Sequence, residues 1–254
     1  PDISVIGPLA RSANDLYSAI KVMAGPDEIV SRGYQLNLPE LSERSLAELK
    51  VGVWKNDEAA PVAQEVEARV DLVVAALRDA GAHITEDAKP DFNADHSNEV
   101  YQRLLQATMA SRMPLENYER LKAYVQNELD PEDNSTTAQT LRAQVSSFKE
   151  WSQANEMRHQ LRWRWHEYFQ QYDILITPMM ATPAFKHDQR PFAERTLQVD
   201  NQERPYFEQV FWAGLTGVAY LPSTVIPTGL NDLGLPIGVQ IVGPQYGDLI
   251  TIGV

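Results

Sequence analysis

The stretch AYLPSTVIPTGLNDLGLPIGVQIVGP, residues 219–244, contains two apolar, strand-like runs that are joined by a Gly-rich link. Pro222 and Pro227 fix the backbone φ angle and remove N–H donors near the strand ends, while the glycines permit tight turns. Gln240 is the lone amide in the second run, and an unpaired buried amide costs about 1–3 kcal/mol. We therefore predict a rigid two-stranded wall in which Gln240 is a structural clasp, with contact to a substrate as the alternative role.

A strand, a helix and a second strand come earlier in the chain. Residues 49–54 alternate in polarity like a strand, Pro61 opens a helix that runs to Gly81, and residues 82–86 form the second strand. The apolar residues on one face of this helix are Val62, Val66, Val70, Val73 and Leu77. Because the three elements follow one another within about forty residues, they predict a βαβ unit and therefore parallel strand pairs in the sheet.

The middle of the chain is mostly helical in pattern. Residues 94–171 have helical periodicity that is interrupted by the polar cluster DPEDNS at 130–135. Residues 173–178, DILITP, form a continuous apolar run, which is typical of a central strand buried on both faces. We expect a Pro-rich, poorly periodic loop over 178–205 and a short helix around 205–213.

Composition excludes several classes of protein. The chain has 254 residues, a formal net charge of −13, 43% hydrophobic residues and no cysteine. The acidic balance disfavours nucleic acids and anionic membranes, and no apolar run approaches the roughly 20 residues of a membrane span. The absence of cysteine excludes disulfides, thiolate nucleophiles and cysteine-ligated zinc, and it fits a cytoplasmic location. We expect a soluble globular protein that uses no metal or cofactor.

The two ends of the chain have the sequence features of an internal segment of a longer protein. Pro1 begins the chain without an initiator methionine or a signal peptide, and residues 11–26 predict a short helix with Ser12 as its N-cap. At the other end, Asp248 opens what resembles the first turn of a helix, and the chain stops at Val254. We therefore expect a fragment of a longer protein.

Short motifs supply no complete catalytic group. An SxxK pattern, in which a lysine one helical turn after a serine could act as its base, occurs as Ser18 with Lys21 and as Ser146 with Lys149. Both pairs are on predicted amphipathic helices and lack the boxes that accompany such a motif in known hydrolases. We interpret both pairs as solvated helix faces.

The histidines and arginines also have ordinary interpretations. A single ExxH motif ends at His159, whereas a carboxylate-bridged di-metal site needs this motif from two helices. His187 and Asp188 lie in the long loop, where an ordinary polar pair is favoured over a substrate-orienting pair. Arginines and tryptophans interleave over residues 151–165, and their helical spacing favours core packing over a stacking platform for nucleic acid.

Three segments resemble consecutive segments of the amidase signature hydrolases. They are SVIGPLARSANDLYSAIKVMAGPD (residues 4–27), YDILITPMMATPA (residues 172–184) and LPSTVIPTGLNDLGLPIGVQIVGP (residues 221–244). Their order and approximate spacing match as well, so the resemblance spans essentially the whole chain. The most specific signal is the strand ending in a Pro-x-Gly turn and followed by GLPxGxQxxGP. The chain departs from the family at GLTGVAYLPS, residues 214–223, where an Asn-Leu-Ala-Gly-Leu-Pro run is usual.

The resemblance implies an α/β class fold, an α/β/α arrangement with a mixed sheet flanked by helices. Residues 1–254 would form the C-terminal part of a single amidase domain, with a helical excursion over about 94–171. Enzymes of this family hydrolyse carboxylic amides with a Ser, cis-Ser, Lys triad that lies upstream of the GPLARS-like segment. No residue of this chain matches a triad position, so we predict that the chain alone is inactive.

The resemblance also implies a substrate pocket on the acyl side. The expected substrate-binding residues are Met179, Met180, Thr182, Trp212, Thr216 and Tyr220. These groups favour an aromatic or aliphatic acyl group, unless the methionines and Trp212 simply fill the core. The alternative functions are a component of a tRNA-dependent amidotransferase and a non-catalytic binding domain. The expected partner is a small-molecule amide, and a homodimer is compatible with the sequence.

Overall fold

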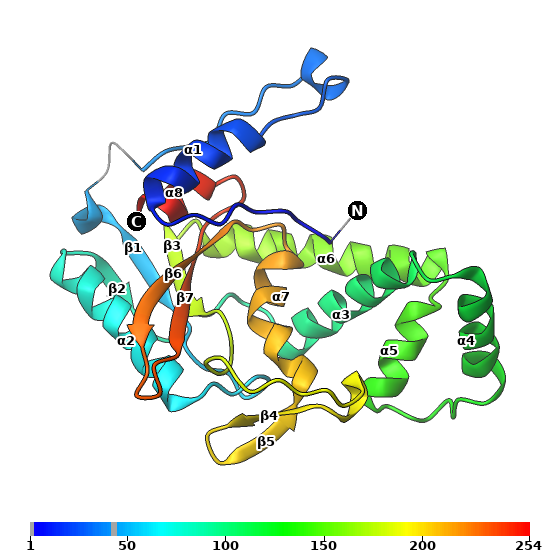
Figure 1. The fold of residues 1–254 in the computed structure, drawn as a ribbon. Coiled ribbons are helices and arrows are strands. Elements are labelled where there is room, and N and C mark those ends of the chain that lie inside the picture. Colours follow the sequence, from blue (N-terminus) through cyan, green and yellow to red (C-terminus); the bar gives the residue numbers. More distant parts are fainter. Residues whose placement is uncertain (1–2, 42–44) are drawn as a thin grey trace.

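A computed structural model describes residues 3–41 and 45–254, and Figure 1 shows them arranged around one mixed β-sheet. Within these residues the sheet has five strands in the order β2-β1-β3-β7-β6. The strands are β1 Lys50–Val53, β2 His83–Thr85, β3 Ile174–Pro178, β6 Ser223–Leu230 and β7 Pro236–Val242. β1 is parallel to β2 and β3, whereas β7 is antiparallel to β3 and β6. The predicted parallel pairs and the mixed sheet are both confirmed.

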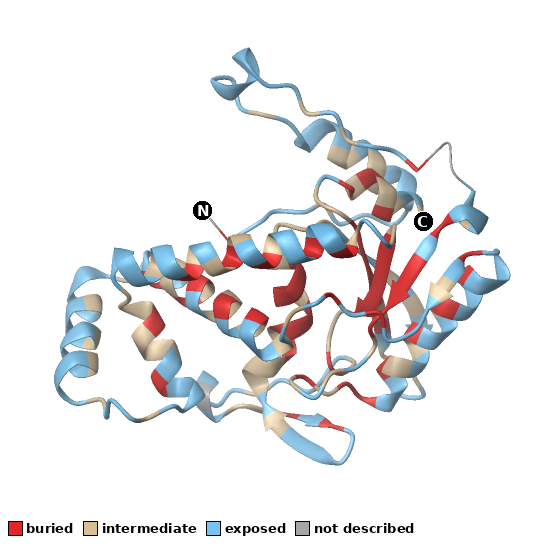
Figure 2. Cartoon of the chain, turned by 180° about the vertical axis from the view of Figure 1, so that it is seen from behind, coloured by how far each residue is buried: buried red, intermediate tan, exposed pale blue. Residues whose placement is uncertain are grey.

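Helices cover both faces of the sheet. They include α2 Gln64–Asp79 on one face, and α3 Ala94–Ala110, α6 Phe148–Tyr168 and α7 Phe211–Gly217 on the other. Ile174 and Ile176 of β3 pack with α2, whereas Leu175 joins the opposite cluster, because successive side chains of a strand point to opposite faces. Every residue of β3 is buried, and Figure 2 shows buried residues in the central strands and on the helix faces that pack against them. The predicted central strand is confirmed.

Helix α2 begins later than its proline predicts. The helix starts three residues after Pro61, because the intervening backbone is extended and its donors bind elsewhere in the chain. The Val62 N–H donates to the Asn56 side chain, and the Ala63 N–H donates to the carbonyl of Ala181 at 2.9 Å. On the buried face of the helix, Val74 stands where the sequence pattern indicated Val73. Tertiary hydrogen bonds therefore decide where this helix begins.

The predicted helical region, which the structure describes throughout, contains four helices. Besides α3 and α6 these are α4 Leu115–Asn127 and α5 Thr136–Gln144, and the DPEDNS link separates α4 from α5. A capping box between Ser147 and Glu150 begins α6. The Arg158 side chain is only 2% exposed and Trp165 is fully buried, so this stripe of α6 packs in the core. The core-packing interpretation of the arginines and tryptophans is confirmed for these two residues.

The expected poorly periodic loop over 178–205 is wrong in its second half, where a β-hairpin forms. Its strands are β4 Thr196–Val199 and β5 Gln202–Pro205, which pair antiparallel. At the turn, Asp200 adopts a φ of 49°, and its carboxylate accepts from the N–H of Gln64 at the start of α2. Asp200 thereby caps a distant helix. The predicted short helix is a 3₁₀ turn, Tyr206–Val210, that leads into α7.

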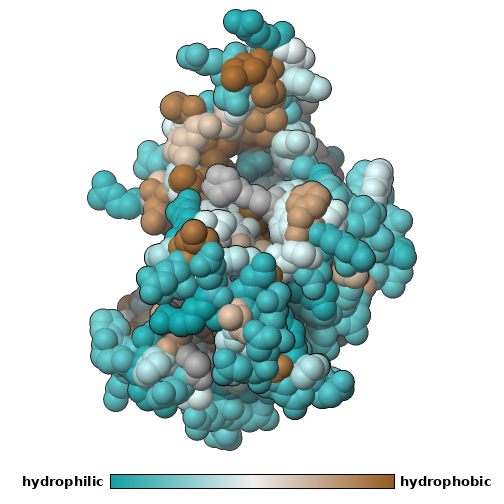
Figure 3. Space-filling model, turned by 90° about the vertical axis from the view of Figure 1, so that its right-hand side faces the viewer, coloured by the Kyte–Doolittle hydropathy of each residue, from teal (hydrophilic) through white to brown (hydrophobic). Residues whose placement is uncertain are grey.

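An N-terminal arm, residues 3–37, contacts the rest of the molecule through Ile3, which is buried in the main core cluster, and through one helix. This helix is α1, Ala13–Met23, which begins at the predicted N-cap Ser12 and lies beside α8, Asp248–Gly253. α1 has no buried residue within the described chain. The exposed large apolar side chains of the arm are Val5, Ile6, Leu9, Val22, Met23, Ile29, Val30 and Tyr34. Figure 3 shows apolar groups gathered at the top of the molecule, where the arm lies.

Candidate functional site

Gln240 joins three segments of the chain through its side chain. Its Nε2 donates to the carbonyl of Pro178, at the end of β3, and to the carbonyl of Trp212, in α7, at 3.0 Å each. Its Oε1 accepts from Ser223 Oγ, at the start of β6, at 2.7 Å. The side chain is 1% exposed, so every hydrogen bond replaces one that water would make. The clasp predicted from the sequence is confirmed.

The three predicted residues that follow β3 lie in a loop held at both ends. Met179 and Met180 are half-buried, and the Thr182 hydroxyl donates to the carbonyl of Pro183 at 3.0 Å. Between them, the Ala181 carbonyl accepts from the backbone of α2's N-cap, as described above. Gln240 thus holds one end of this loop through Pro178, and the start of α2 holds the other.

The predicted residues of α7 differ in their surroundings. Trp212 is fully buried and lies edge-on to Trp54, with ring centroids 5.6 Å apart, so its ring fills the core. Its indole N–H has no hydrogen-bond partner in the part of the chain that the structure describes. The Thr216 hydroxyl donates to the Ala213 carbonyl at 3.0 Å. The core-filling alternative therefore describes Trp212 in this structure, and its contact with a substrate stays a prediction.

Tyr220 is the most unusual of the six residues. It has a φ of 58° three residues after the end of α7, and the next N–H, that of Leu221, donates to the Thr216 carbonyl and closes the helix. A left-handed conformation favours glycine, and for a tyrosine it is an outlier. The chain departs from the Asn-Leu-Ala-Gly-Leu-Pro run of the family resemblance here, and Tyr220 stands directly before its Leu-Pro pair. The guanidinium carbons of Arg158 and Arg162 lie 4.8 and 5.2 Å from its ring centroid.

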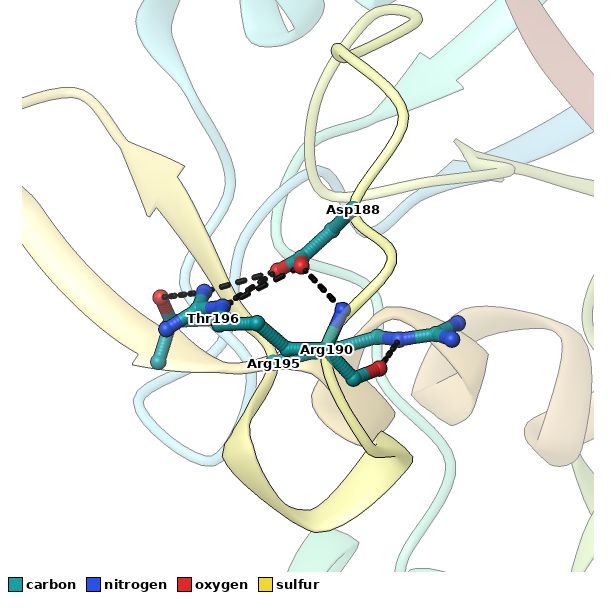
Figure 4. A network of polar contacts seen from close by, with 4 residues as sticks. All are labelled: Asp188, Arg190, Arg195 and Thr196. Carbon is teal, nitrogen blue, oxygen red and sulfur yellow. Dashed lines mark hydrogen bonds and ion pairs between the residues drawn. The ribbon is translucent and has the colours of Figure 1, made fainter.

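The same loop carries a polar network farther along, which Figure 4 shows. The Asp188 carboxylate accepts from the backbone N–H and the guanidinium of Arg190, and Arg190 Nη2 also reaches Thr196 Oγ1 at 3.4 Å. These bonds from Arg190 hold the pKa of Asp188 below its usual range. Arg195 Nε donates to the Arg190 carbonyl at 2.7 Å. Asp188 is therefore used to fold its own loop, which favours the ordinary interpretation of this polar pair.

Neither SxxK pair has the geometry of a nucleophile with its base. Ser18 Oγ donates to the carbonyl of Asn14, and Lys21 Nζ binds the Glu40 carboxylate at 2.8 Å. This bond to Glu40, with a smaller effect of Tyr17, raises the pKa of Lys21, whereas a general base needs a lowered one. The first pair is a solvated helix face, as predicted.

The second SxxK pair departs from the prediction in its placement. Ser146 lies in the link between α5 and α6, and α6 begins only at Phe148, so Ser146 and Lys149 do not share a helix. The expectation that both pairs are on amphipathic helices is wrong here. The reason is that Ser147, and not Ser146, supplies the N-cap of α6.

Among the described residues, three cavities or grooves stand out, and none of these three is lined by the six predicted residues. A small cavity of about 10 Å³ lies beside Ala181, under the β4–β5 hairpin. A groove of about 380 Å³ lies between α3, α4 and α5, and an open one of about 490 Å³ lies at the β2 edge. Within residues 3–41 and 45–254, no three histidine or acidic side chains converge as a metal would require. No described helix has the length and apolarity to cross a membrane.

Sequence reasoning missed two partners in this region. Ser223 is the third contact of the clasp, and Trp54 is the ring against which Trp212 packs. The register contains a signal for Ser223: Val225 pairs with Gln240, so Ser223 is two residues away on the same face of the sheet. Trp54 follows β1, far from α7 in the sequence. No local pattern connects it to Trp212.

Comparisons with known proteins agree on one family. The model of the Amidase family matches residues 1–251. The A subunit of a glutamyl-tRNA(Gln) amidotransferase from Synechococcus sp. (strain CC9902) is 28% identical over 94% of this chain and 50% of its own length. An indoleacetamide hydrolase of Bradyrhizobium diazoefficiens is 26% identical over 98% of this chain and 44% of its own length.

Solved structures share the fold. A bacterial aryl acylamidase of the amidase signature enzymes aligns with a TM-score of 0.67 at 21% identity, over 98% of this chain and 51% of its own. The A subunit of the glutamyl-tRNA(Gln) amidotransferase of Thermotoga maritima aligns with a TM-score of 0.66 at 18% identity, over 98% and 50%. The chain therefore spans about half the length of the relatives and the structures it matches.

Proposed function

This chain belongs to the amidase family, and we propose that it forms the acyl-side wall of a serine hydrolase that cleaves carboxylic amides other than peptide bonds. In this proposal, residues 1–254 are the C-terminal part of a single amidase domain, with the helical excursion over about 94–171. A Ser, cis-Ser, Lys triad is supplied by polypeptide outside these residues. The observation that carries the proposal is the Gln240 clasp, which holds together the two segments that the family resemblance assigns to the acyl side.

The electrostatics of the chain support a triad from outside. Lys21, which follows Ser18, is bound to the Glu40 carboxylate. Ser146 lies in the link before α6, so it does not share a helix with Lys149. Removing a catalytic serine from a hydrolase costs on the order of a millionfold in kcat in the subtilisin example. The chain alone is therefore expected to be inactive, and its contribution is the shape of the acyl pocket.

The substrate that we propose is a small amide with an aromatic or aliphatic acyl group. Met179, Met180 and Tyr220 are half-buried and present apolar or aromatic surface. One of the matched proteins, an indoleacetamide hydrolase, is named for an amide with an aromatic acyl group. No cofactor is needed for such a hydrolysis, and we place the enzyme in the cytoplasm.

The experiment has two arms. In the first, the purified 254-residue chain is incubated with aryl and alkyl amides and with a fluorophosphonate probe that labels activated serines. We expect neither turnover nor labelling. Hydrolysis that survives both Ser18→Ala and Ser146→Ala would overturn the assignment of the triad to polypeptide outside this chain.

The second arm uses the triad-complete enzyme, in which this chain is joined to the polypeptide that its gene encodes upstream. We expect that segment to contain a Gly/Ser-rich stretch and an earlier lysine, which sequencing checks. The complete enzyme should label with the probe and hydrolyse arylacetamides. A complete enzyme that labels but cleaves no amide in the panel would contradict the proposed reaction.

A component of an amidotransferase is the second candidate, because one of the matched proteins at 28% identity bears that name. The two functions differ in the acyl group, since an amidotransferase acts on glutamine. Glutamine hydrolysis by the triad-complete enzyme that exceeds arylacetamide hydrolysis would favour this candidate. The apolar side chains of the predicted pocket favour the amidase, as does the net charge of −13, which disfavours a tRNA partner.

A further inference from the structure

We propose that Gln240, with Ser223, is a positioning residue for the acyl pocket, and this inference rests on the proposed function. A positioning residue here is one that touches no substrate but fixes the segments that do. The side chain of Gln240 is the one group described above that bonds both the loop after β3 and helix α7. Gln240 would therefore affect the reaction by setting the width of the acyl pocket, without contacting the triad.

The position of Gln240 in the sheet makes this role available. Its backbone pairs with Thr177 of β3 on one side and with Val225 of β6 on the other, so its Cα is fixed in the middle of three strands. Its neighbours on β7, Val239 and Ile241, face α2, and the side chain of Gln240 therefore faces α7. A rigid strand thus holds the Gln240 side-chain amide where it reaches the carbonyls of both Pro178 and Trp212.

The chemistry of the amide is specific to this arrangement. The carbonyl oxygens of Pro178 and Trp212 both accept from Gln240, because an amide NH₂ group supplies two donors. The Pro178 carbonyl also accepts from the Thr177 hydroxyl at 3.1 Å, whereas Gln240 alone reaches across to α7. The remaining amide oxygen is a pure acceptor, and the Ser223 hydroxyl donates to it at 2.7 Å. Ser223 therefore fixes which way the amide is turned. Glutamate at this position would face two carbonyl oxygens with a carboxylate, and methionine would supply no donor at all.

The segments that Gln240 holds carry all six predicted pocket residues. Met179, Met180 and Thr182 follow Pro178 directly, and the other three lie between Trp212 and Tyr220. Each segment has its own second anchor, at the start of α2 and at the Arg158–Tyr220 stack respectively. Gln240 is the anchor they share. Loosening it should change the distance between the two walls and leave each wall folded.

Hydrogen exchange on the 254-residue chain tests the shared anchor without any activity. In Ser223→Ala and Gln240→Met, amides in residues 178–184 and 211–221 should exchange roughly tenfold faster than in the parent chain. Amides of α2 should be unchanged. The matched control is Thr224→Val, which removes the neighbouring hydrogen bond from β6 to Thr251, 2.8 Å long, and reaches neither segment. Equal acceleration of hydrogen exchange in all regions would show that the substitutions only destabilise the whole fold, and it would overturn the proposal.

Kinetics on the triad-complete enzyme test the consequence for substrates. In Ser223→Ala, we expect KM for a bulky arylacetamide to rise about fivefold to tenfold, with a smaller change for acetamide. The rate of labelling by the fluorophosphonate probe should stay at the parent value, because the triad is not touched. Thr224→Val should match the parent in all three measurements. If Gln240→Met does not fold, Ser223→Ala still decides, since it leaves both donors of Gln240 in place.

The outcomes separate this inference from the proposed function. A parent enzyme without probe labelling and without amide turnover would refute the proposed function. A parent enzyme that is active, with Ser223→Ala lowering all rates equally or none of them, would refute the positioning role alone.

Discussion

The strands around Gln240 and the N-terminal arm, residues 3–37, differ in the burial of their apolar side chains. β3 is buried at all of its residues and is tied by side-chain hydrogen bonds to its neighbours, whereas α1 has no buried residue in the described chain. The arm is attached through Ile3 in the core, through α8, and through bonds from Tyr17 and Lys21 to Glu40. Leu9 on the arm is fully exposed, and Trp212 in the clasped region is fully buried.

Hydrophobicity alone does not determine whether a residue of this chain is buried. Burial needs a partner surface of matching shape, and α7 finds one in Trp54, Tyr101 and the sheet. The arm presents apolar groups that the described chain leaves uncovered, and such patches mark interaction surfaces. In the proposed triad-complete enzyme, we expect further polypeptide to pack on the arm.

The largest loss of stability should come from removing the buried Trp212 side chain beside the Gln240 clasp. Trp212→Ala should lower the free energy of unfolding by about 3–5 kcal/mol, because it empties a fully buried site that Trp54 cannot fill. The measurement is urea unfolding followed by circular dichroism. Trp163→Ala is the matched control, since Trp163 is 67% exposed, and it should change stability by less than about 0.5 kcal/mol. Similar losses for both variants would contradict the burial contrast.

A second variant tests how closely α7 packs. Gly214→Ala would place a methyl group 2.6 Å from Tyr101 Cδ1, so α3 or α7 must shift, at a cost of about 1–3 kcal/mol. Gly217→Ala, on the same helix, meets the Tyr101 ring at 3.6 Å, an ordinary contact. It should be neutral or slightly stabilising because alanine favours the helix. The difference in thermal midpoint between the two variants is the readout, and equal midpoints would show that α3 yields freely.

The pH dependence of the free energy of unfolding reports on the burial of the Tyr168 phenol. Burial, with a smaller effect of Tyr172, raises the pKa of Tyr168, whose hydroxyl donates to the Ala88 carbonyl at 3.2 Å. A raised pKa means that the folded state keeps a proton that the unfolded state loses above about pH 10. The stability from Tyr168 is therefore complete below that pH and falls as pH rises, by up to about 1.4 kcal/mol per pH unit.

The variant that checks this is Tyr168→Phe. It should lose about 0.5–1.5 kcal/mol at neutral pH, because the hydrogen bond to Ala88 is gone. Above about pH 10, its stability should fall less steeply than that of the parent, although Tyr101, whose pKa is also raised by burial, keeps part of the slope. Urea unfolding at about pH 8 and about pH 10.5 measures both effects. Parallel pH curves for the two proteins would argue against a buried, neutral phenol.

Substitutions on the arm should matter least. Leu9→Ser and Ile6→Ser should each change the stability of the chain by less than about 0.5 kcal/mol, since both side chains are exposed. Binding of the dye ANS should fall together with the apolar surface. In the triad-complete enzyme the same substitutions should destabilise by more than in the chain alone. An equal, negligible effect in both proteins would contradict the expected cover over the arm.

Periodicity predicts some parts of the fold and not others. The βαβ unit follows from periodicity, whereas the central strand DILITP and the paired strands around Gln240 follow from continuous apolar runs. No such pattern indicates the β4–β5 hairpin. Its strands are four residues long and lie in a Pro-rich stretch, and Asp200 is held in part by a distant helix N-terminus. Such a hairpin depends on contacts that no local window contains.

The residues alone were enough to predict that Gln240 is hydrogen-bonded, because an amide inside an apolar strand must find partners. They were also enough to indicate the family, through the order of three segments. The packing of the chain selected Pro178, Trp212 and Ser223 as the partners, and it placed Tyr220 in a left-handed conformation beside two arginines. This division arises because the need for a hydrogen bond is a property of one residue, whereas the atom that satisfies it is chosen by how distant segments pack.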